Sequence, residues 1–127
     1  RPAKLQAEEA RETFVGVQIE SRAALDDLDA IAAVPDLDML FIGPADLSQE
    51  LGVLGQPDHP RVWEAIERVA AVCKNSGKIW GIVPFGAASA ERCLDLGCRM
   101  LPLGSECHGL RMGIDALKTM YGKIFAV

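Results

Sequence analysis

Two hydrophobic periodicities alternate along the chain. In some stretches apolar residues stand at every second position or form a near-continuous run, and in others they recur at every third or fourth position. The first pattern predicts β-strands and the second predicts α-helices, of which the stripe Val62, Ile66, Val69 and Cys73 is the clearest. The predicted strands cover residues 14–20, 38–43, 78–83 and 99–104, and the predicted helices cover about residues 3–12, 22–33, 60–73, 88–96 and 107–121.

Residues with strong preferences for helix ends mark several of these boundaries. Ser21 suits the N-cap of the helix over residues 22–33. Pro60 suits a first helical position, and Gly97 suits the position just after a helix end. His59, directly before Pro60, is therefore interpreted as a helix-entry residue. The last predicted helix carries an apolar face of its own, made of Leu110, Ile114, Leu117 and Tyr121.

The order of the elements, βαβαβαβα, predicts an α/β fold. Strands that alternate with helices require right-handed crossovers and a parallel sheet. Four strands can form a small open sheet, but they also correspond to half of an eight-stranded (β/α)8 TIM barrel, which takes about 250 residues. Pro102 fits an interior strand poorly because it has no N–H to donate, so a bulge or an edge position is expected there. We expect residues 1–127 to form a single domain.

Composition and charge exclude several classes of protein. The 127 residues are 50% apolar and 24% charged, with a mean hydropathy of +0.15, which is too apolar for a disordered chain. No apolar run reaches the roughly 18 residues that a membrane span needs. A net charge of −5 argues against a nucleic-acid binder. We therefore expect a cytoplasmic protein with neither nucleic acid nor membrane among its partners.

The cysteines and the first residue add two expectations. Cys73, Cys93, Cys98 and Cys107 lie in apolar or helical stretches without CxxC spacing, so they are interpreted as buried free thiols. The chain begins with Arg1 instead of Met, and no signal-peptide pattern precedes it. We expect it to be a piece of a longer protein.

Two carboxylates are predicted to meet at one edge of the sheet. Gln18 and Glu20 share one face at the carboxyl end of the strand over 14–20, where α/β folds bind ligands. Asp46 follows the next strand, 26 residues after Glu20, which is about one βα repeat. A hard divalent cation such as Mg²⁺ or Mn²⁺ would offset the repulsion between the two carboxylates. Two alternatives stay open: Asp46 could begin a capping box with Gln49, and Glu20 could stand before a helix because the helix dipole favours it.

A Gly-Pro turn, Gly43-Pro44-Ala45, lies between these two carboxylates in the chain. A turn of this kind at the start of a helix leaves the backbone amides of Ala45 and Asp46 unpaired and directed outward. Such amides bind anions, so the turn is a candidate seat for a substrate carboxylate. As a lone motif it has little specificity.

A longer stretch, VGVQIESRAALDDLDAIAAVPDLDMLFIGPADLSQELGVLGQPDHP, resembles the HpcH/HpaI aldolase family, the class II pyruvate aldolases of the 4-hydroxy-2-oxoheptanedioate aldolase type. The QIES strand end, the IGPADLS turn and the GQPDHP loop occur in the order and at the spacing of that family. The resemblance is strong over residues 14–60 and looser to about residue 118. It matches strands five to eight of the family's TIM barrel, so it implies the carboxyl-terminal half of that barrel.

The resemblance implies a role for each candidate residue. Glu20 and Asp46 match the family's metal ligands, and Gln18 matches the glutamine that contacts pyruvate. The amides of Ala45 and Asp46 match those that receive the pyruvate carboxylate. The implied reaction is the cleavage of a 4-hydroxy-2-oxo acid to pyruvate and an aldehyde through a metal-bound enolate, with Mg²⁺, Mn²⁺ or Co²⁺ as cofactor. Decarboxylation of oxaloacetate would use the same site.

Parts of the family's site have no counterpart in this chain. The general-base histidine and the pyruvate-binding arginine of the family lie in the amino half of its barrel. Glu106 stands where the family often has an aspartate, and the segment over residues 83–89, VPFGAAS, is unusual. We therefore expect the chain alone to be weak or inactive as a catalyst. We also expect it to form a homo-oligomer or to pair with a missing amino-terminal half.

Other interpretations remain open. His108, which follows the fourth predicted strand, is a weak candidate for proton transfer. The chain could be a citrate-lyase or malyl-CoA-lyase relative, or a non-catalytic half barrel that assembles with a partner. Gly104-Ser105 lies where many barrels bind phosphate. Lys78 and Arg99 stand at the amino ends of their strands, the wrong end for this site.

Overall fold

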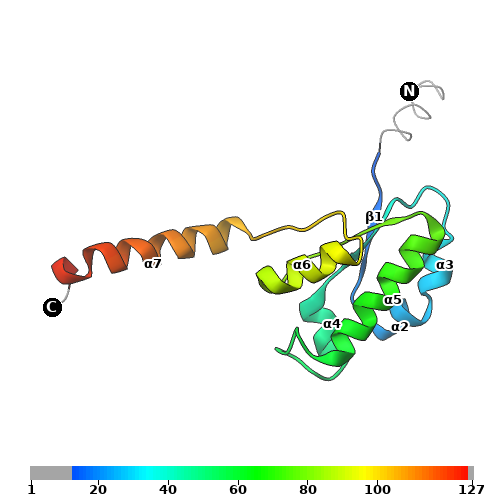
Figure 1. The fold of residues 1–127 in the computed structure, drawn as a ribbon, viewed down its shortest axis with the longest axis horizontal. Helices are drawn as coiled ribbons and strands as arrows, with labels where there is room; N and C mark the ends of the chain where they lie inside the picture. Colours follow the sequence, from blue (N-terminus) through cyan, green and yellow to red (C-terminus); the bar gives the residue numbers. More distant parts are fainter. Residues whose placement is uncertain (1–12, 126–127) are drawn as a thin grey trace, which may run out of the picture.

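The computed structural model describes residues 13–125 as a parallel sheet with helices (Figure 1). The alternation of strands and helices expected from the sequence is confirmed, while the helix predicted over residues 3–12 lies outside the described residues. None of the helices in the described part of the chain is long and apolar enough to span a membrane. In chain order the elements are β1 (Gly16–Ile19), α2 (Arg22–Asp26), α3 (Leu28–Ala32), β2 (Met39–Ile42), α4 (Pro44–Glu50), α5 (Pro60–Ser76), β3 (Ile79–Ile82), α6 (Ala87–Asp95) and α7 (Glu106–Phe125).

The three strands form one parallel sheet in the order β1-β2-β3. Ile19 lies opposite Ile42, which in turn lies opposite Ile82. These three isoleucines are fully buried, and α5 packs against β2 and β3. Gln18 and Phe41, neighbours in the register, belong to the opposite face of the sheet. The carboxyl ends of all three strands therefore meet at the same edge.

The residues assigned to helix ends act as predicted. Ser21 is the N-cap of α2, and its Oγ accepts a hydrogen bond from the Ala24 N–H at 3.2 Å. His59 is the N-cap of α5, with its Nδ1 accepting from the Arg61 N–H at 3.2 Å, and Pro60 is the first helical residue. These caps satisfy amides that the first turn of a helix leaves without partners.

Two helical segments differ from their predicted extent. The helix predicted over residues 22–33 is divided into α2 and α3, which meet at Asp27. Residues 44–58, which lie outside all the predicted strands and helices, contain α4. Pro44 suits the first position of α4, and the fully buried Leu47 packs it on the core. This short helix therefore forms because of its packing.

The fourth predicted strand, over residues 99–104, is wrong. Among the described residues this segment forms one isolated parallel bridge, between Gly81 and Met100, and no strand. The Ile82 N–H donates to the Met100 carbonyl at 3.0 Å. The Arg99 N–H donates to the Trp80 carbonyl at 2.9 Å, and beyond Met100 the ladder meets Pro102, which has no N–H to donate. Pairing therefore stops after one bridge.

The helix α7 lies apart from the rest of the fold. Figure 1 shows it extending away from the sheet, and every residue from 106 to 124 is exposed. Cys107 in its first turn is exposed as well, so the prediction of four buried thiols is wrong for this one. The other three cysteines, Cys73, Cys93 and Cys98, are buried free thiols, as predicted.

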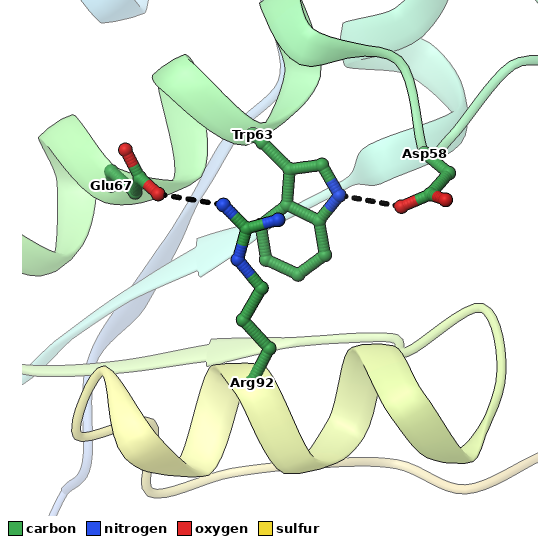
Figure 2. Close-up of polar contacts among 4 residues, drawn as sticks. All are labelled: Asp58, Trp63, Glu67 and Arg92. Carbon is green, nitrogen blue, oxygen red and sulfur yellow. Dashed lines mark hydrogen bonds and ion pairs between the residues drawn. The ribbon is translucent and has the colours of Figure 1, made fainter.

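Four side chains join α6 to α5 and to the loop that precedes α5 (Figure 2). The Arg92 guanidinium lies 3.7 Å from the centre of the Trp63 ring, and its Nη2 contacts Glu67 Oε1 at 2.8 Å. Trp63 is buried, and its Nε1–H donates to Asp58 Oδ1 at 2.6 Å. Phe85, in the loop between β3 and α6, meets the Trp63 ring edge-on at 5.6 Å between centroids. Through Phe85 the loop after β3 joins this cluster.

Candidate functional site

Glu20 and Asp46 come together at the carboxyl edge of the sheet. Glu20 directly follows β1, and Asp46 lies in the first turn of α4, which directly follows β2. A Cβ added to Gly43 would stand 2.7 Å from Glu20 Oε2 and 3.7 Å from Asp46 Oδ2. The two oxygens therefore cannot be further apart than the sum of those distances. Only glycine leaves this space open, and both carboxylates face it.

Gln18 belongs to the same group of polar side chains. Its Nε2 donates to Glu20 Oε2 at 3.2 Å. Both residues are on the face of β1 that is not packed against α5, as the period of two predicts. The bond leaves the second amide proton and the carbonyl oxygen of Gln18 available for a ligand.

The structure excludes the capping-box interpretation of Asp46. The N-cap of α4 is Gly43, and Asp46 is the third residue of the helix. The first helical hydrogen bond runs from the Leu47 N–H to the Gly43 carbonyl at 2.9 Å. The amides of Ala45 and Asp46 precede that bond, so they lie among the unpaired N–H groups of the helix start, as predicted. The dipole of α4 still favours a carboxylate in this turn.

The carboxylate pair fits a hard divalent cation. Within residues 13–125 there is no group of three or more His, Cys, Asp or Glu side chains that could hold a metal, so a closed site of the zinc type is not formed there. Mg²⁺ is often bound through one or two carboxylates, with water or substrate oxygens in the other positions. The space beside Gly43, lined by two carboxylates and widened by the missing Cβ, has that chemistry.

His108 lies in a different group of residues. It borders a cavity of about 350 Å³ beside the loop after β3 and the segment before α7, together with Val83, Pro84, Pro102, Leu103, Gly104 and Ser105. The backbone N–H of His108 donates to Ser105 Oγ at 3.2 Å, so the Ser105 side chain binds an amide in the first turn of α7. Within the described residues no hydrogen bond or ion pair joins His108 to Glu20 or Asp46.

Sequence reasoning missed one residue that bears on the site. The Arg22 Nε donates to the carbonyl of Glu50 at 2.7 Å, which ties the start of α2 to the end of α4. No sequence pattern indicates such a bond, because its acceptor is a backbone group. Lys78, by contrast, behaves as expected: its Nζ donates to the carbonyls of Val34 and Leu37 at the amino end of β3, away from the site.

The chain is similar to curated proteins that are named as aldolases. The chain is 41% identical over 106 residues to the 4-hydroxy-2-oxo-heptane-1,7-dioate aldolase of Salmonella paratyphi B, a match over 84% of this chain and 40% of that protein. It is 40% identical over 107 residues to the 5-keto-4-deoxy-D-glucarate aldolase of Escherichia fergusonii, over 84% of this chain and 42% of that protein. The chain thus spans less than half the length of these curated relatives.

A solved structure and a family profile give the same result. The crystal structure of an HpcH/HpaI aldolase/citrate lyase family protein from Burkholderia cenocepacia J2315 superposes with a TM-score of 0.82 at 37% identity, over 94% of this chain and 47% of that one. The profile described as HpcH/HpaI aldolase/citrate lyase matches residues 2–112. The chain belongs to the HpcH/HpaI aldolase/citrate lyase family.

Proposed function

We propose that this chain supplies the metal-binding and pyruvate-binding half of the active site of a carbon–carbon lyase. The reaction is the cleavage of a 4-hydroxy-2-oxo acid to pyruvate and an aldehyde. The observation that carries the proposal is the convergence of Glu20 and Asp46 on the space beside Gly43. Membership of the family supports it, and so do two relatives that are named as aldolases of oxo or keto acids.

In this proposal Glu20 and Asp46 hold a divalent cation, Mg²⁺, Mn²⁺ or Co²⁺, in keeping with the general dependence of the family on divalent metals. When bound, the cation supplies Lewis acidity that stabilises negative charge developing on a keto oxygen. Gln18 orients the Glu20 carboxylate through its 3.2 Å hydrogen bond and offers its second amide proton to the substrate. The amides of Ala45 and Asp46, in the turn that begins with Gly43 and Pro44, receive the substrate carboxylate.

The chain supports only part of this chemistry by itself. Enolisation needs a positioned base, and the loss of general acid–base help costs about 10²–10⁴-fold in rate. In the described part of the chain His108 makes no hydrogen bond or ion pair with either carboxylate. We propose that the base comes from the rest of the barrel, because the curated relatives are more than twice as long as the matched segment. The isolated chain is then a weak catalyst that pairs with a second copy or with an amino-terminal half.

The first test measures Mn²⁺ binding to the chain of residues 1–127, by the loss of the electron paramagnetic resonance signal of free Mn²⁺. Glu20→Gln and Asp46→Asn keep the size of each side chain and remove one charge each, so we expect each to weaken binding at least about tenfold. Asp115→Asn, on the exposed helix α7, is the matched control and should bind as wild type does. Gly43→Ala, which places a methyl group 2.7 Å from Glu20 Oε2, should also weaken binding.

The second test measures the reaction. We expect the chain to accelerate oxaloacetate decarboxylation above the rate of the same free Mn²⁺ concentration, and we expect excess chelator or Glu20→Gln to abolish the difference. Addition of the amino-terminal half of a full-length relative should raise the release of pyruvate from a 4-hydroxy-2-oxo acid. Inactivation by borohydride in the presence of pyruvate would instead indicate a Schiff-base lysine and overturn the proposal. Activity on citrate alone would favour a citrate-lyase-type reaction at the same site.

A further inference from the structure

The short helix α4 needs more than its core contact to hold Asp46 in place. Leu47 and Ser48 are the buried residues of this seven-residue helix, and they anchor its middle. The start of α4 is held as well, because its N-cap Gly43 follows β2 directly and donates its N–H to the Ile19 carbonyl at 3.4 Å. The last turn has neither kind of anchor, and a tilt of the helix from that end would shift Asp46 relative to Glu20. Because a helix moves as a rigid rod over so short a length, fixing its last turn also fixes its first.

Arg22 fixes that last turn from the segment that carries Glu20. Its Nε donates to the Glu50 carbonyl at 2.7 Å, one of the carbonyls that a helix end leaves without a partner. Arg22 is also the first residue of α2, two positions after Glu20. The Ser21 cap between them, which accepts from the Ala24 N–H, holds this turn in one conformation. A short path therefore runs from Glu20 through Arg22 to the end of α4.

A second arginine contacts the same end of α4 without belonging to that path. Arg61 Nη1 donates to the carbonyl of Leu51, the C-cap of α4, at 3.3 Å. Arg61 comes from α5, so its bond joins α4 to the helical layer and not to Glu20. The two arginines share the chemistry of a cation at a helix end and differ in the segment they come from.

We propose that Arg22 is a positioning residue for the carboxylate pair: its bond to the Glu50 carbonyl couples the end of α4 to the Glu20 segment and, together with the bond of Gly43 to Ile19, sets the separation of Glu20 and Asp46. This inference rests on the proposed function, which makes the pair a metal site. Arg22 touches neither the metal nor the substrate. It acts through the position of Asp46.

The test compares Arg22→Ala, Arg22→Lys and Arg61→Ala in the full chain, with Mn²⁺ affinity and the urea midpoint of unfolding measured for each. We expect Arg22→Ala to lose about tenfold in Mn²⁺ affinity, the size typical of residues that orient metal ligands. Arg22→Lys keeps a donor for the carbonyl and should restore most of that affinity. Arg61→Ala should lower the urea midpoint as much as Arg22→Ala does and leave the Mn²⁺ affinity unchanged.

The outcomes separate the two proposals. If wild type does not bind Mn²⁺ while the helical content of the chain is intact, the proposed function is wrong. If wild type binds Mn²⁺ and Arg22→Ala binds it equally well, the positioning role is wrong while the metal site stands. Equal losses of affinity in Arg22→Ala and Arg61→Ala would mean that any stabilisation of α4 suffices, which also overturns the coupling through Arg22.

Discussion

The helices α5 and α7 show the same apolar periodicity and have opposite surroundings. The stripe of α5, Val62, Ile66, Val69 and Cys73, is at most 1% exposed. The corresponding stripe of α7, Leu110, Ile114, Leu117 and Tyr121, is 43–67% exposed. In Figure 1 α5 lies alongside the sheet, whereas α7 extends away from it.

The difference shows what periodicity determines. Spacing of three and four residues makes a helix amphipathic and fixes which side chains share a face. It does not determine what covers that face, because burial depends on elements that are distant in sequence. For α5 the partners are β2, β3, α3 and α4, brought there by the βα order of the chain. For α7 residues 106–124 are all exposed, so its apolar face meets solvent.

The largest expected effect uses one residue type in both helices. Ile66 is fully buried and Ile114 is 43% exposed. We expect Ile66→Ala to lower the free energy of unfolding by about 2–5 kcal/mol, through lost burial and the cavity left behind. Ile114→Ala should change it by less than about 0.5 kcal/mol. Urea unfolding followed by circular dichroism measures both, and a loss of similar size for Ile114→Ala would show that α7 is covered in solution.

The cysteines allow the same comparison of buried and exposed side chains, through the dependence of the free energy of unfolding on pH. Burial raises the pKa of Cys73 and of Cys93 from 9 to about 11, whereas Cys107 in α7 is exposed. Below pH 9 the two buried thiols are protonated in both the folded and the unfolded state, so their contribution to stability is complete. Between pH 9 and about 11 only the unfolded state loses these protons, so stability falls as pH rises, by roughly 3 kcal/mol for each thiol.

Two measurements check the prediction for the thiols. Cys73→Ala should make the fall in the free energy of unfolding between pH 9 and 11 shallower than in wild type, and Cys107→Ala should leave it unchanged. In the folded chain at pH 8 a thiol reagent should label one cysteine, and all four should react in denaturant. Labelling of Cys73 at the rate of Cys107 would contradict the burial difference.

The sequence predicts the fold where local chemistry and tertiary packing agree. Ser21 and Pro60 act at helix ends because their preferences arise from the backbone next to them. The fourth strand fails at Pro102, where an apolar pattern conflicts with a missing N–H. The prediction that Cys107 is buried is wrong because an apolar stretch indicates burial only when some other element covers it.

The candidate site was predictable in part for similar reasons. Glu20 and Asp46 meet because parallel neighbouring strands end at one edge, and the interval of one βα repeat contains that information. The contact of Gln18 with Glu20 follows from the alternation of faces along β1. Two other contacts depend on the packing of separate helices and have no signature in the sequence. They are the hydrogen bond from Arg22 to the Glu50 carbonyl and the stacking of the Arg92 guanidinium on the Trp63 ring.

The smallest expected effect compares two ion pairs. Glu67 and Arg92 join α5 to α6 at 2.8 Å, with side chains 48% exposed, and Arg92 also lies over the Trp63 ring (Figure 2). Asp115 and Lys118, three residues apart on α7, are 3.7 Å apart and more exposed, at 62% and 74%. We expect a coupling energy of about 0.5–1 kcal/mol for the first pair and about 0.3 kcal/mol or less for the second.

Double-mutant cycles with Glu67→Gln and Arg92→Gln, and with Asp115→Asn and Lys118→Gln, measure the two couplings by urea unfolding. At high salt the coupling between Glu67 and Arg92 should fall, because the pair is half exposed and screened. The separate cost of Arg92→Gln should persist there, since the guanidinium stacks on a buried indole that is itself held by Asp58. Equal coupling energies would mean that an ion pair between the packed helices α5 and α6 is no stronger than one on the exposed helix α7.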